Sequence, residues 1–374
     1  MRLPLALILF AGLSAAHAQT APRCDAQPAA SAGRVQLTEI AGGLENPWAL
    51  AFLPDGRLLV TERPGRLRIV AADGKLSAPL AGVPAVVARG QGGLLDVLLD
   101  PDFARNRLIY LGYSEAGEGG SGTALARARL DENALALRDL RVIYRQTPKV
   151  SGNGHFGQRF AFGADGKLYV TLGERQKQDP AQDPQQSLGK VIRLNPDGSV
   201  PADNPFAGRS GWLPEIYSLG HRNPQGLIRQ PGTERLWISD HGARGGDEIN
   251  LLTPGSNYGW PVISYGTHYT GFKIGEGQSK PGMLQPLCYW DPSIAAGNLA
   301  FYTADKAPGW RGNLFVAALR DQAVHRLTLD GTRIIGNERI PVGKRVRDIR
   351  LGPDGWLYLT TDEREGQILR LSLQ

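Results

Sequence analysis

A short motif of turn residues followed by an apolar run recurs six times along the chain. In each copy Gly, Asp, Asn or Pro forms the turn, and three apolar residues follow, often with Ser or Thr next. The six runs cover residues 58–60, 108–110, 168–170, 236–238, 314–316 and 357–359. Short apolar runs bounded by turn residues are typical of β-strands.

Several copies continue into a second run in which polar and apolar residues alternate. Residues 66–70, 324–327 and 367–371 show this period of two, as expected for the next strand of an antiparallel hairpin. No long segment shows the 3.6-residue period of an amphipathic helix. The pattern therefore predicts an all-β fold with few helices.

The number and the uneven spacing of the copies favour a propeller. With residues 1–18 set aside, the remaining 356 residues give about 59 residues per copy, close to one four-stranded blade with its loops. The first leucines of successive copies are 43 to 78 residues apart. A propeller tolerates such different loops, whereas a solenoid keeps a fixed period. We predict a six-bladed β-propeller of four-stranded antiparallel blades, with a large sandwich as the alternative.

The first 18 residues have the pattern of a secretory signal peptide. Arg2 precedes an apolar run over residues 3–13, and Ala-His-Ala at 16–18 matches a signal-peptidase site. We expect cleavage near Ala18, a tail over 19–34 and a propeller over 35–374, in the periplasm or outside the cell. Export permits a disulfide between Cys24 and Cys288, but two unpaired thiols fit the sequence equally well. No other stretch is apolar enough to span a membrane, so we expect no stable membrane insertion.

Composition and charge narrow the class of ligand. Apolar residues make up 41% and charged residues 21% of the 374, which indicates a large core and argues against disorder. The net charge is +6, but the basic residues are scattered and aromatic residues are only 7%. A nucleic-acid partner is therefore not expected, and the surplus of arginine instead suggests an acidic small molecule.

One histidine lies in a setting that suits acid–base chemistry. Residues 152–157 match Gly-x-Gly-x-x-Gly, but a strand follows where a dinucleotide site needs a helix. The glycines leave the imidazole of His155 accessible in a loop, and a neutral imidazole near pH 7 can abstract a proton. A purely structural histidine is the competing interpretation. The histidines show no zinc-ligand spacing.

Three further stretches carry groups that would suit a cation and an anion. Residues 220–226 place Arg222 beside Asn223 before a turn, and residues 241–250 combine backbone carbonyls with carboxylates that suit a hard cation such as calcium. Arg345 and Arg347 alternate, so both project from one strand face and can hold carboxylates. Together with Gln91, these groups predict a calcium and polyanion pocket on one face of the propeller.

Seven motifs, in order, resemble one family. They are Pro-Trp at 47–48 with Leu-Pro-Asp-Gly at 53–56, Gly-Gln-Gly-Gly-Leu at 90–94, Gly-His-Phe-Gly at 154–157, His-Arg-Asn-Pro-Gln-Gly at 221–226, Asp-Glu-Ile-Asn at 247–250, Asn-Tyr-Gly-Trp-Pro at 257–261 and Arg-Val-Arg-Asp at 345–348. From about residue 44 to 371 the chain is similar to the soluble pyrroloquinoline quinone (PQQ)-dependent aldose sugar dehydrogenases, relatives of soluble glucose and sorbosone dehydrogenases. That family folds as a six-bladed propeller.

The resemblance implies a role for each matching residue. His155 would be the general base that takes the proton of the anomeric hydroxyl while hydride passes to PQQ. The carbonyls of Gly242 and Ala243 would hold a PQQ-bound calcium, and Glu248 and the Tyr258 carbonyl a second, structural calcium. The residues implied in contact with PQQ are Gln91, Arg222, Asn223, Tyr269, Ala318, Leu319, Arg320, Arg345, Val346 and Arg347.

The chain departs from the family pattern at three positions. Arg320 stands where the family usually has Lys, and Ala243 where it often has Pro. Gly154 stands where the glucose dehydrogenase branch has Asp before the base. That missing carboxylate leaves the orientation of His155 unassigned and argues against narrow glucose specificity.

Two other functions fit a propeller with these residues. A catalytically silent calcium-binding propeller that takes a sugar or a protein would be favoured by loss of His155 or of the arginine pair, and both are present. A lactone hydrolase would need no arginine cluster. We therefore expect a periplasmic aldose dehydrogenase that forms lactones, acting as a monomer or homodimer. The chain lacks a haem-attachment Cys-x-x-Cys-His motif, so an external electron acceptor is expected.

Overall fold

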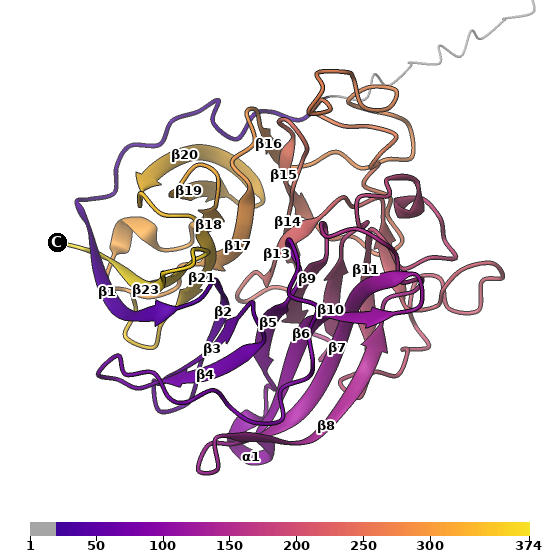
Figure 1. Ribbon diagram of the computed structural model, residues 1–374. Helices are drawn as coiled ribbons and strands as arrows, with labels where there is room; N and C mark the ends of the chain where they lie inside the picture. The colour runs from indigo at the N-terminus through magenta and orange to yellow at the C-terminus, as the bar shows by residue number, and fades with distance from the viewer. Residues whose placement is uncertain (1–19) are drawn as a thin grey trace, which may run out of the picture.

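The computed structural model describes residues 20–374, and nearly all of its regular structure is antiparallel sheet (Figure 1). Helical structure in this part of the chain is confined to α1 (Phe103–Asn106) and the 3-10 turns η1 (Asp179–Ala181) and η2 (Pro308–Trp310). Six sheets stand around a common axis. The predicted six-bladed propeller with few helices is confirmed.

Three blades come from the first part of the chain. Their strands are β2 (Pro47–Phe52), β3 (Leu58–Glu62) and β4 (Arg66–Val70); β5 (Leu94–Leu99), β6 (Leu108–Gly117), β7 (Gly120–Asp131) and β8 (Ala136–Arg145); and β9 (Gly157–Phe162), β10 (Leu168–Leu172), β11 (Lys190–Leu194) and β12 (Ile216–Leu219).

The other three blades include one that joins both ends of the chain. Their strands are β13 (Pro224–Arg229), β14 (Leu236–Asp240), β15 (Asp247–Leu251) and β16 (Cys288–Trp290); β17 (Ala296–Phe301), β18 (Leu314–Ala318), β19 (Ala323–Asp330) and β20 (Arg333–Pro341); and β21 (Val346–Leu351), β22 (Leu357–Thr361), β23 (Gly366–Leu373) and β1 (Val35–Leu44).

The blade of β2, β3 and β4 has three strands, whereas the other five have the four that were predicted. An irregular segment takes the place of its fourth strand. The backbone N–H groups of Ser77 and Leu80 donate to the carbonyls of Ile69 and Leu67, at 2.8 and 2.9 Å. The edge of β4 is therefore partly covered, which protects its hydrogen-bonding groups from pairing with another chain.

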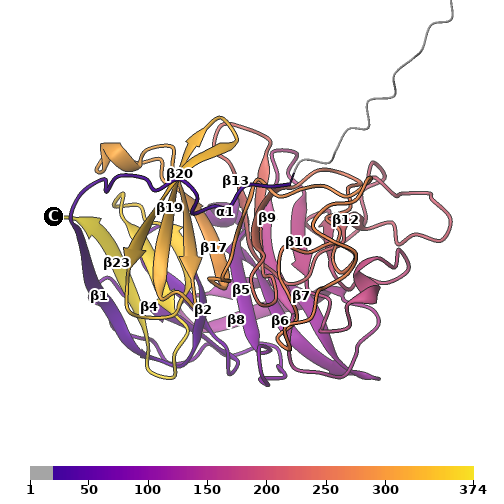
Figure 2. The ribbon, with the colours of Figure 1, turned by 90° about the horizontal axis from the view of Figure 1, so that it is seen from above.

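The ring is closed by pairing the first strand with the last. β1 runs antiparallel to β23, with Val35 opposite Leu373. Figures 1 and 2 show the indigo β1 beside the yellow β23. Because this pairing joins residues from the two ends of the chain, the final blade can form only when both ends are in place.

The recurring apolar runs are the second strands of the six blades, namely β3, β6, β10, β14, β18 and β22. Most of their side chains are buried between neighbouring blades. The innermost strands β2, β5, β9, β13, β17 and β21 contact one another in turn around the axis. Antiparallel pairing brings the start of each innermost strand and the end of each second strand to the same face. We call this the site face.

Charged side chains fill the axis below the site face. Arg159 is fully buried and lies 3.1 Å from a carboxylate oxygen of Asp96 and 3.4 Å from one of Asp348. Its guanidinium carbon is 3.9 Å from the centre of the Trp48 ring. Removing one partner from such a buried network leaves an uncompensated charge, which is strongly destabilising.

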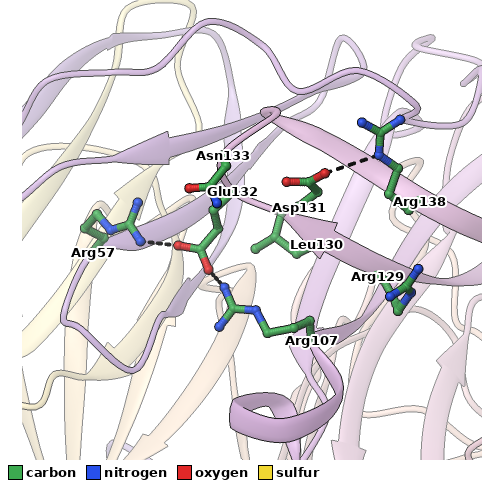
Figure 3. A pocket seen from close by; sticks show the side chains of 8 residues that line it. All are labelled: Arg57, Arg107, Arg129, Leu130, Asp131, Glu132, Asn133 and Arg138. Atoms are coloured by element: carbon green, nitrogen blue, oxygen red, sulfur yellow. Dashed lines mark hydrogen bonds and ion pairs between the residues drawn. The ribbon is translucent and has the colours of Figure 1, made fainter.

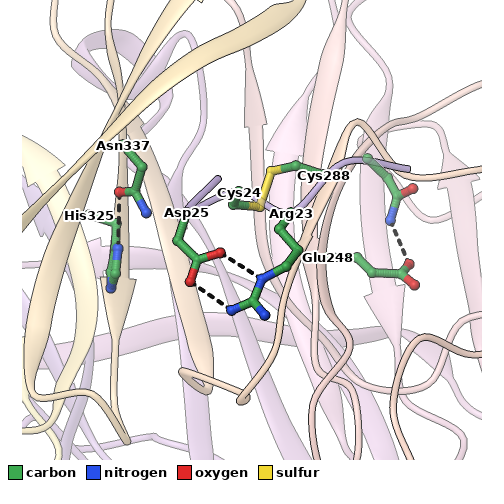
Figure 4. Close-up of a disulfide and its surroundings, with 8 residues drawn as sticks. Arg23, Cys24, Asp25, Glu248, Cys288, His325 and Asn337 are labelled. Carbon is green, nitrogen blue, oxygen red and sulfur yellow. Dashed lines mark hydrogen bonds and ion pairs between the residues drawn. A yellow bond between two sulfur atoms is a disulfide. The ribbon is translucent and has the colours of Figure 1, made fainter. Parts of the chain in front are cut away.

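A disulfide ties the segment before β1 to the rim of the ring. Cys24 is bonded to Cys288, the first residue of β16, with their Cα atoms 4.9 Å apart (Figure 4). Farther along, the N–H of Ala29 donates to the carbonyl of Asn337 in β20 at 2.9 Å. Of the two states that the sequence left open for the cysteines, the structure has the disulfide. The predicted signal peptide lies outside the described residues.

Candidate active site

The residues singled out by sequence follow one structural rule. Gln91 precedes β5, His155 precedes β9, Arg222 and Asn223 precede β13, and Arg347 lies at the start of β21. All of these positions are on the site face, because each innermost strand begins there. The propeller topology thus gathers groups that are up to 256 residues apart in the chain.

Hydrogen bonds between loops hold the candidate base in place. The backbone N–H of His155 donates to Oε1 of Gln91 at 2.7 Å. The N–H of Gly157 donates to Oδ1 of Asn223 at 3.1 Å. His155 is 6% exposed and has φ of +50°, a left-handed backbone that is uncommon for a side-chain-bearing residue. Gln91, His155 and Asn223 therefore form one connected group from three blades.

Glu174 orients the imidazole, and the sequence analysis missed it. Its Oε1 lies 2.5 Å from Nδ1 of His155, and its carboxylate is fully buried. Its other oxygen accepts hydrogen bonds from the N–H groups of Lys177 and of Gln178, the latter at 2.7 Å. An ionised carboxylate only accepts hydrogen bonds, so Nδ1 carries the proton and Nε2 has a free lone pair.

The protonation state of His155 is set by two opposing influences. Burial lowers its pKa below the ordinary value because the charged imidazolium is poorly solvated, while the hydrogen bond to Glu174 raises it; Arg222 lowers it further. The net direction is downward. The imidazole is therefore neutral at pH 7 and able to accept a proton at Nε2.

Two nearly buried arginines lie on the same face as His155. Arg222 is 7% exposed and donates to the carbonyls of His241, at 3.3 Å, and Gly242. Arg347 is 8% exposed and its guanidinium pairs with Asp362 at 2.5 Å. The Nε of each arginine is buried and has no hydrogen-bond partner among residues 20–374. Buried donors of this kind normally find a partner.

Two further polar residues connect the arginines to the base, and neither was predicted. Gln225 accepts from Arg347 at 2.7 Å and donates to Oδ1 of Asn223 at 3.1 Å. Asp362 pairs with Arg347 and has its pKa lowered to about 2, since the attraction of Arg347 outweighs burial. A polar network thus runs from Asn223 across the axis to Asp362.

The position of Glu174 and Asp362 in the chain is the signal that could have located them. Asp362 directly follows β22, and Glu174 follows β10 by one residue. Both second strands are copies of the recurring motif, and the ends of these strands reach the site face. Acidic residues just after each copy were thus candidates that the sequence analysis overlooked.

The predicted calcium ligands lie together on the site face. Gly242 and Ala243 follow β14 in a buried turn, and a cavity of about 20 Å³ is lined by Gly242, Glu248 and Tyr258 among others. Burial raises the pKa of Glu248 to about 8, with the charge of Asp240 adding to the effect. Among residues 20–374 no three His, Cys, Asp or Glu side chains cluster as a metal site.

The remaining predicted contacts differ in exposure. Ala318, Leu319 and Val346 are buried, so only their backbone atoms could face a ligand. Tyr269 is 75% exposed, at a turn of the long loop between β15 and β16. Arg320 and Arg345 are exposed. None of these residues makes a hydrogen bond to His155.

Gln176 occupies the space left by the glycine before the base. A Cβ atom added to Gly154 would lie 2.6 Å from Cδ of Gln176. Glu174 supplies the carboxylate that an Asp at 154 was expected to provide. The missing orienting group of the sequence analysis is therefore present in this chain, on a different loop.

The opposite face of the propeller holds a cavity with different chemistry. It has a volume of about 390 Å³, and its arginines face carboxylates (Figure 3). Arg57 and Arg107 both pair with Glu132, and Arg138 pairs with Asp131. The ion pairs in this cavity neutralise one another.

The fold and the site together define the class of the protein: a six-bladed propeller that holds a buried histidine–carboxylate pair and two nearly buried arginines on one face. The chain belongs to the glucose/sorbosone dehydrogenase family, whose sequence model matches residues 44–370. The resemblance predicted for residues 44–371 is confirmed.

Individual relatives cover nearly the whole chain. The aldose sugar dehydrogenase YliI of Escherichia coli K12 is 46% identical over 92% of this chain and 94% of its own. The crystal structure of the soluble aldose sugar dehydrogenase from Escherichia coli, in the apo-form, superposes with a TM-score of 0.89 over 91% of this chain and all of that one, at 46% identity. The PQQ-bound aldose sugar dehydrogenase from Streptomyces coelicolor has a TM-score of 0.77 at 31% identity, over 93% of this chain and 99% of that one. Within residues 20–374 no helix is long and apolar enough to cross a membrane.

Proposed function

We propose that the protein is a PQQ- and calcium-dependent dehydrogenase that oxidises aldose sugars at the anomeric carbon to lactones. The observation that carries the proposal is the buried pair of His155 and Glu174, 2.5 Å apart. It lies on the same face as two arginines whose Nε atoms have no hydrogen-bond partner in the described part of the chain. The names of the relatives, an aldose sugar dehydrogenase and a PQQ-bound form of another, support the same reaction.

The donors on the site face fit the chemistry of PQQ, which carries three carboxylates. Arg222 and Arg347 would hold carboxylates through their guanidinium groups. Gln91 and Asn223 would donate amide hydrogen bonds, and Arg320 would add a planar cation where relatives have a point charge. The backbone groups of Ala318, Leu319 and Val346 and the side chains of Tyr269 and Arg345 complete the proposed set.

Oxygen donors nearby fit calcium, which prefers carbonyl and carboxylate ligands. The carbonyls of Gly242 and Ala243 would hold a calcium beside PQQ. Glu248 and the carbonyl of Tyr258 would hold a second ion, because they line a cavity whose 20 Å³ leaves room for one small particle. The positive charge of a cation there would also stabilise the ionised Glu248 carboxylate, whose pKa is raised by burial.

The chain's own residues would carry out the proton transfer. Nε2 of His155 would accept the proton of the anomeric hydroxyl as the carbon–hydrogen bond breaks and a carbonyl forms. Glu174 would stabilise the imidazolium through Nδ1 and prevent the ring from turning. When bound, PQQ supplies the carbon that accepts the hydride, and calcium acts as a Lewis acid on its carbonyl oxygen. The reduced cofactor would pass its electrons to an external acceptor.

We also propose that the protein works in the periplasm or outside the cell. The disulfide between Cys24 and Cys288 supports this location, since such bonds persist in oxidising compartments. The signal-peptide pattern of residues 1–18 points the same way.

Reconstitution of purified apo-protein tests the function. PQQ and calcium are added together or singly, and aldose-dependent reduction of an artificial dye is followed. Activity that needs both and is lost on chelation with EGTA is the expected result. Binding of PQQ without turnover of any aldose would instead favour a silent binding propeller.

A matched pair of histidine variants tests the base. His155→Gln should abolish turnover and leave PQQ bound. His325→Gln is the control, because His325 is similarly buried, at 4% exposure, and pairs with Asp321 on the third strand of its blade, where the proposed reaction gives it no role. Turnover by His155→Gln at the wild-type rate would refute the assignment of the base.

A further inference from the structure

Arg175 is a wholly buried cation whose guanidinium binds the loop that carries His155. Its side chain is 0% exposed. One terminal nitrogen donates to the carbonyl of Gly154 at 2.5 Å, and the other donates to the carbonyl of Gly152 at 2.7 Å. These two carbonyls lie one and three residues before the base. The proposed reaction assigns Arg175 no task.

The backbone that this guanidinium holds is strained. His155 has φ of +50°, and Arg175 and Gln176 each have φ of +59°. A left-handed backbone costs a residue with a side chain about 1–2 kcal/mol, and it persists only where the surroundings over-determine it. The N–H of Arg175 donates to the carbonyl of His155 at 3.1 Å. Arg175 therefore fixes both sides of the strained residue, through its side chain and through its backbone.

Further contacts anchor the arginine to the rigid part of the propeller. A terminal nitrogen donates to Oγ of Ser121, in β7 of the neighbouring blade, at 3.0 Å. The guanidinium carbon lies 3.7 Å from the centre of the Phe156 ring. A planar group with several donors can make these contacts at once, which the point charge of a lysine cannot.

We propose that Arg175 is a positioning residue for the base. It holds the loop of Gly152 and Gly154 so that the imidazole of His155 keeps Nδ1 on Glu174 and presents Nε2 to the substrate. The neighbouring residues Glu174 and Arg175 thus divide one task, the first holding the ring and the second holding the backbone beneath it. The proposal rests on the proposed function, in which His155 is the base.

A histidine tautomer measurement on the apo-protein tests the positioning directly. Nitrogen-15 NMR of the imidazoles, with His155 assigned by its loss in His155→Gln, should show Nδ1 protonated in the wild type. In Arg175→Lys the signal should move toward a mixture of both tautomers. Arg326→Lys is the control. Arg326 is 3% exposed and donates to backbone carbonyls of Gly309 and Ala30, far from the site face.

Kinetics of the reconstituted enzyme provide the second readout. Arg175→Met should lower kcat on the order of 10²-fold, as a small misplacement of a catalytic group does, with a much smaller change in KM. The acid limb of the pH profile should move, because the bond to Glu174 is weakened. Arg175→Lys keeps the charge and the stem, so it gives a folded variant even where Arg175→Met does not fold.

Two results would overturn the proposal. One is an unchanged tautomer in Arg175→Lys, and the other is an unchanged kcat per folded molecule with only a lower melting temperature. Arg175 would then be purely structural, like Arg326. A wild-type protein without turnover would refute the proposed function instead, and the NMR comparison would still decide the role of Arg175.

Discussion

Replacing Glu174 by Gln is the sharpest test of the site, because it changes one atom and reverses a hydrogen bond. In the wild type one carboxylate oxygen faces Nδ1 of His155, and the other accepts from the N–H groups of Lys177 and Gln178. A glutamine has a single acceptor oxygen and an NH₂ group that only donates. It cannot serve both sides as the carboxylate does.

The structure decides which way the new amide would face. If its NH₂ pointed at the backbone, the N–H of Gln178 would face another donor and lose its hydrogen bond, while the N–H of Lys177 would keep only the carbonyl of Glu174. A lost hydrogen bond costs about 0.5–1.5 kcal/mol, and the repulsion between facing donors adds to it, so this orientation is disfavoured. The amide oxygen therefore takes the backbone side, and the NH₂ faces His155. The imidazole must then accept at Nδ1 and carry its proton on Nε2.

The expected consequence is loss of the base with little loss of structure. A catalytic imidazole held in the wrong tautomer costs on the order of 10⁴-fold in kcat. Steady-state kinetics with saturating PQQ and calcium measure this loss, and thermal unfolding of the same sample checks the fold. Glu174→Asp is the companion variant, since it keeps the charge and shortens the reach.

The pH profile gives an independent check on the same pair. The pKa of His155 is lowered by burial and raised in part by Glu174. Because the pKa of His155 is lowered, kcat/KM of the wild type should fall at a pH below the ordinary histidine value of about 6.5. The residual activity of Glu174→Gln should fall at a still lower pH, since the hydrogen bond that raises this pKa is lost. Because the pKa of His155 is lower in the folded than in the unfolded protein, the contribution of the neutral imidazole to folding stability is fully present above the unfolded value of about 6.5. It is lost as the pH falls from there through the folded-state pKa. A variant with wild-type kcat and an unmoved acid limb would refute this reasoning.

Four substitutions test the scaffold around the site. Cys24→Ser should cost about 3–5 kcal/mol in urea unfolding, because the disulfide closes a loop of 264 residues, with kcat kept at 25 °C. Asp348→Asn should cost about 3–5 kcal/mol, since it removes a charge from the buried axis. Gly173→Ala should lower kcat and the melting temperature together, because the added Cβ would lie 2.2 Å from the carbonyl oxygen of His155. The added Cβ of Gly154→Ala meets only the end of the flexible Gln176 side chain, so this variant should change stability by less than about 1 kcal/mol.

Each of these has an outcome that contradicts it. An unchanged urea midpoint for Cys24→Ser would mean that the disulfide constrains only the rim. A midpoint for Asp348→Asn equal to that of the wild type would show that the axis tolerates an unbalanced charge. Equal melting temperatures for Gly173→Ala and Gly154→Ala would mean that the backbone near the base yields easily.

The fold could be predicted from the sequence because one strand per blade carries a local signature. The six second strands combine a turn with a short apolar run, for example residues 168–170 in β10, and their count gave the number of blades. The innermost strands are less regular. Pro224–Arg229 and Val346–Leu351 carry polar side chains inward to the axis, and no period reveals them. They appear only when the blades are assembled.

The site was predicted only in part, because the sequence shows local motifs but not the contacts between distant segments. His155, Arg222 and Arg347 lie in motifs that can be read locally, although only the relatives give those motifs a meaning. Glu174 and Gln225 act through contacts between loops that are distant in sequence; the place of Glu174 after β10 marks it as a candidate, but its partner appears only in the folded structure. A carboxylate that orients a histidine 19 residues away is a tertiary feature.

The pairing of β1 with β23 makes the order of the blades independent of where the polypeptide starts. Val35 stands opposite Leu373, so a short linker could join the two ends within one hairpin. New ends could be cut at the turn of Gly232, where nothing packs within 4 Å of an added Cβ atom. Such a circular permutant would keep all six blades and every group on the site face, while these groups would follow one another in a different order along the chain.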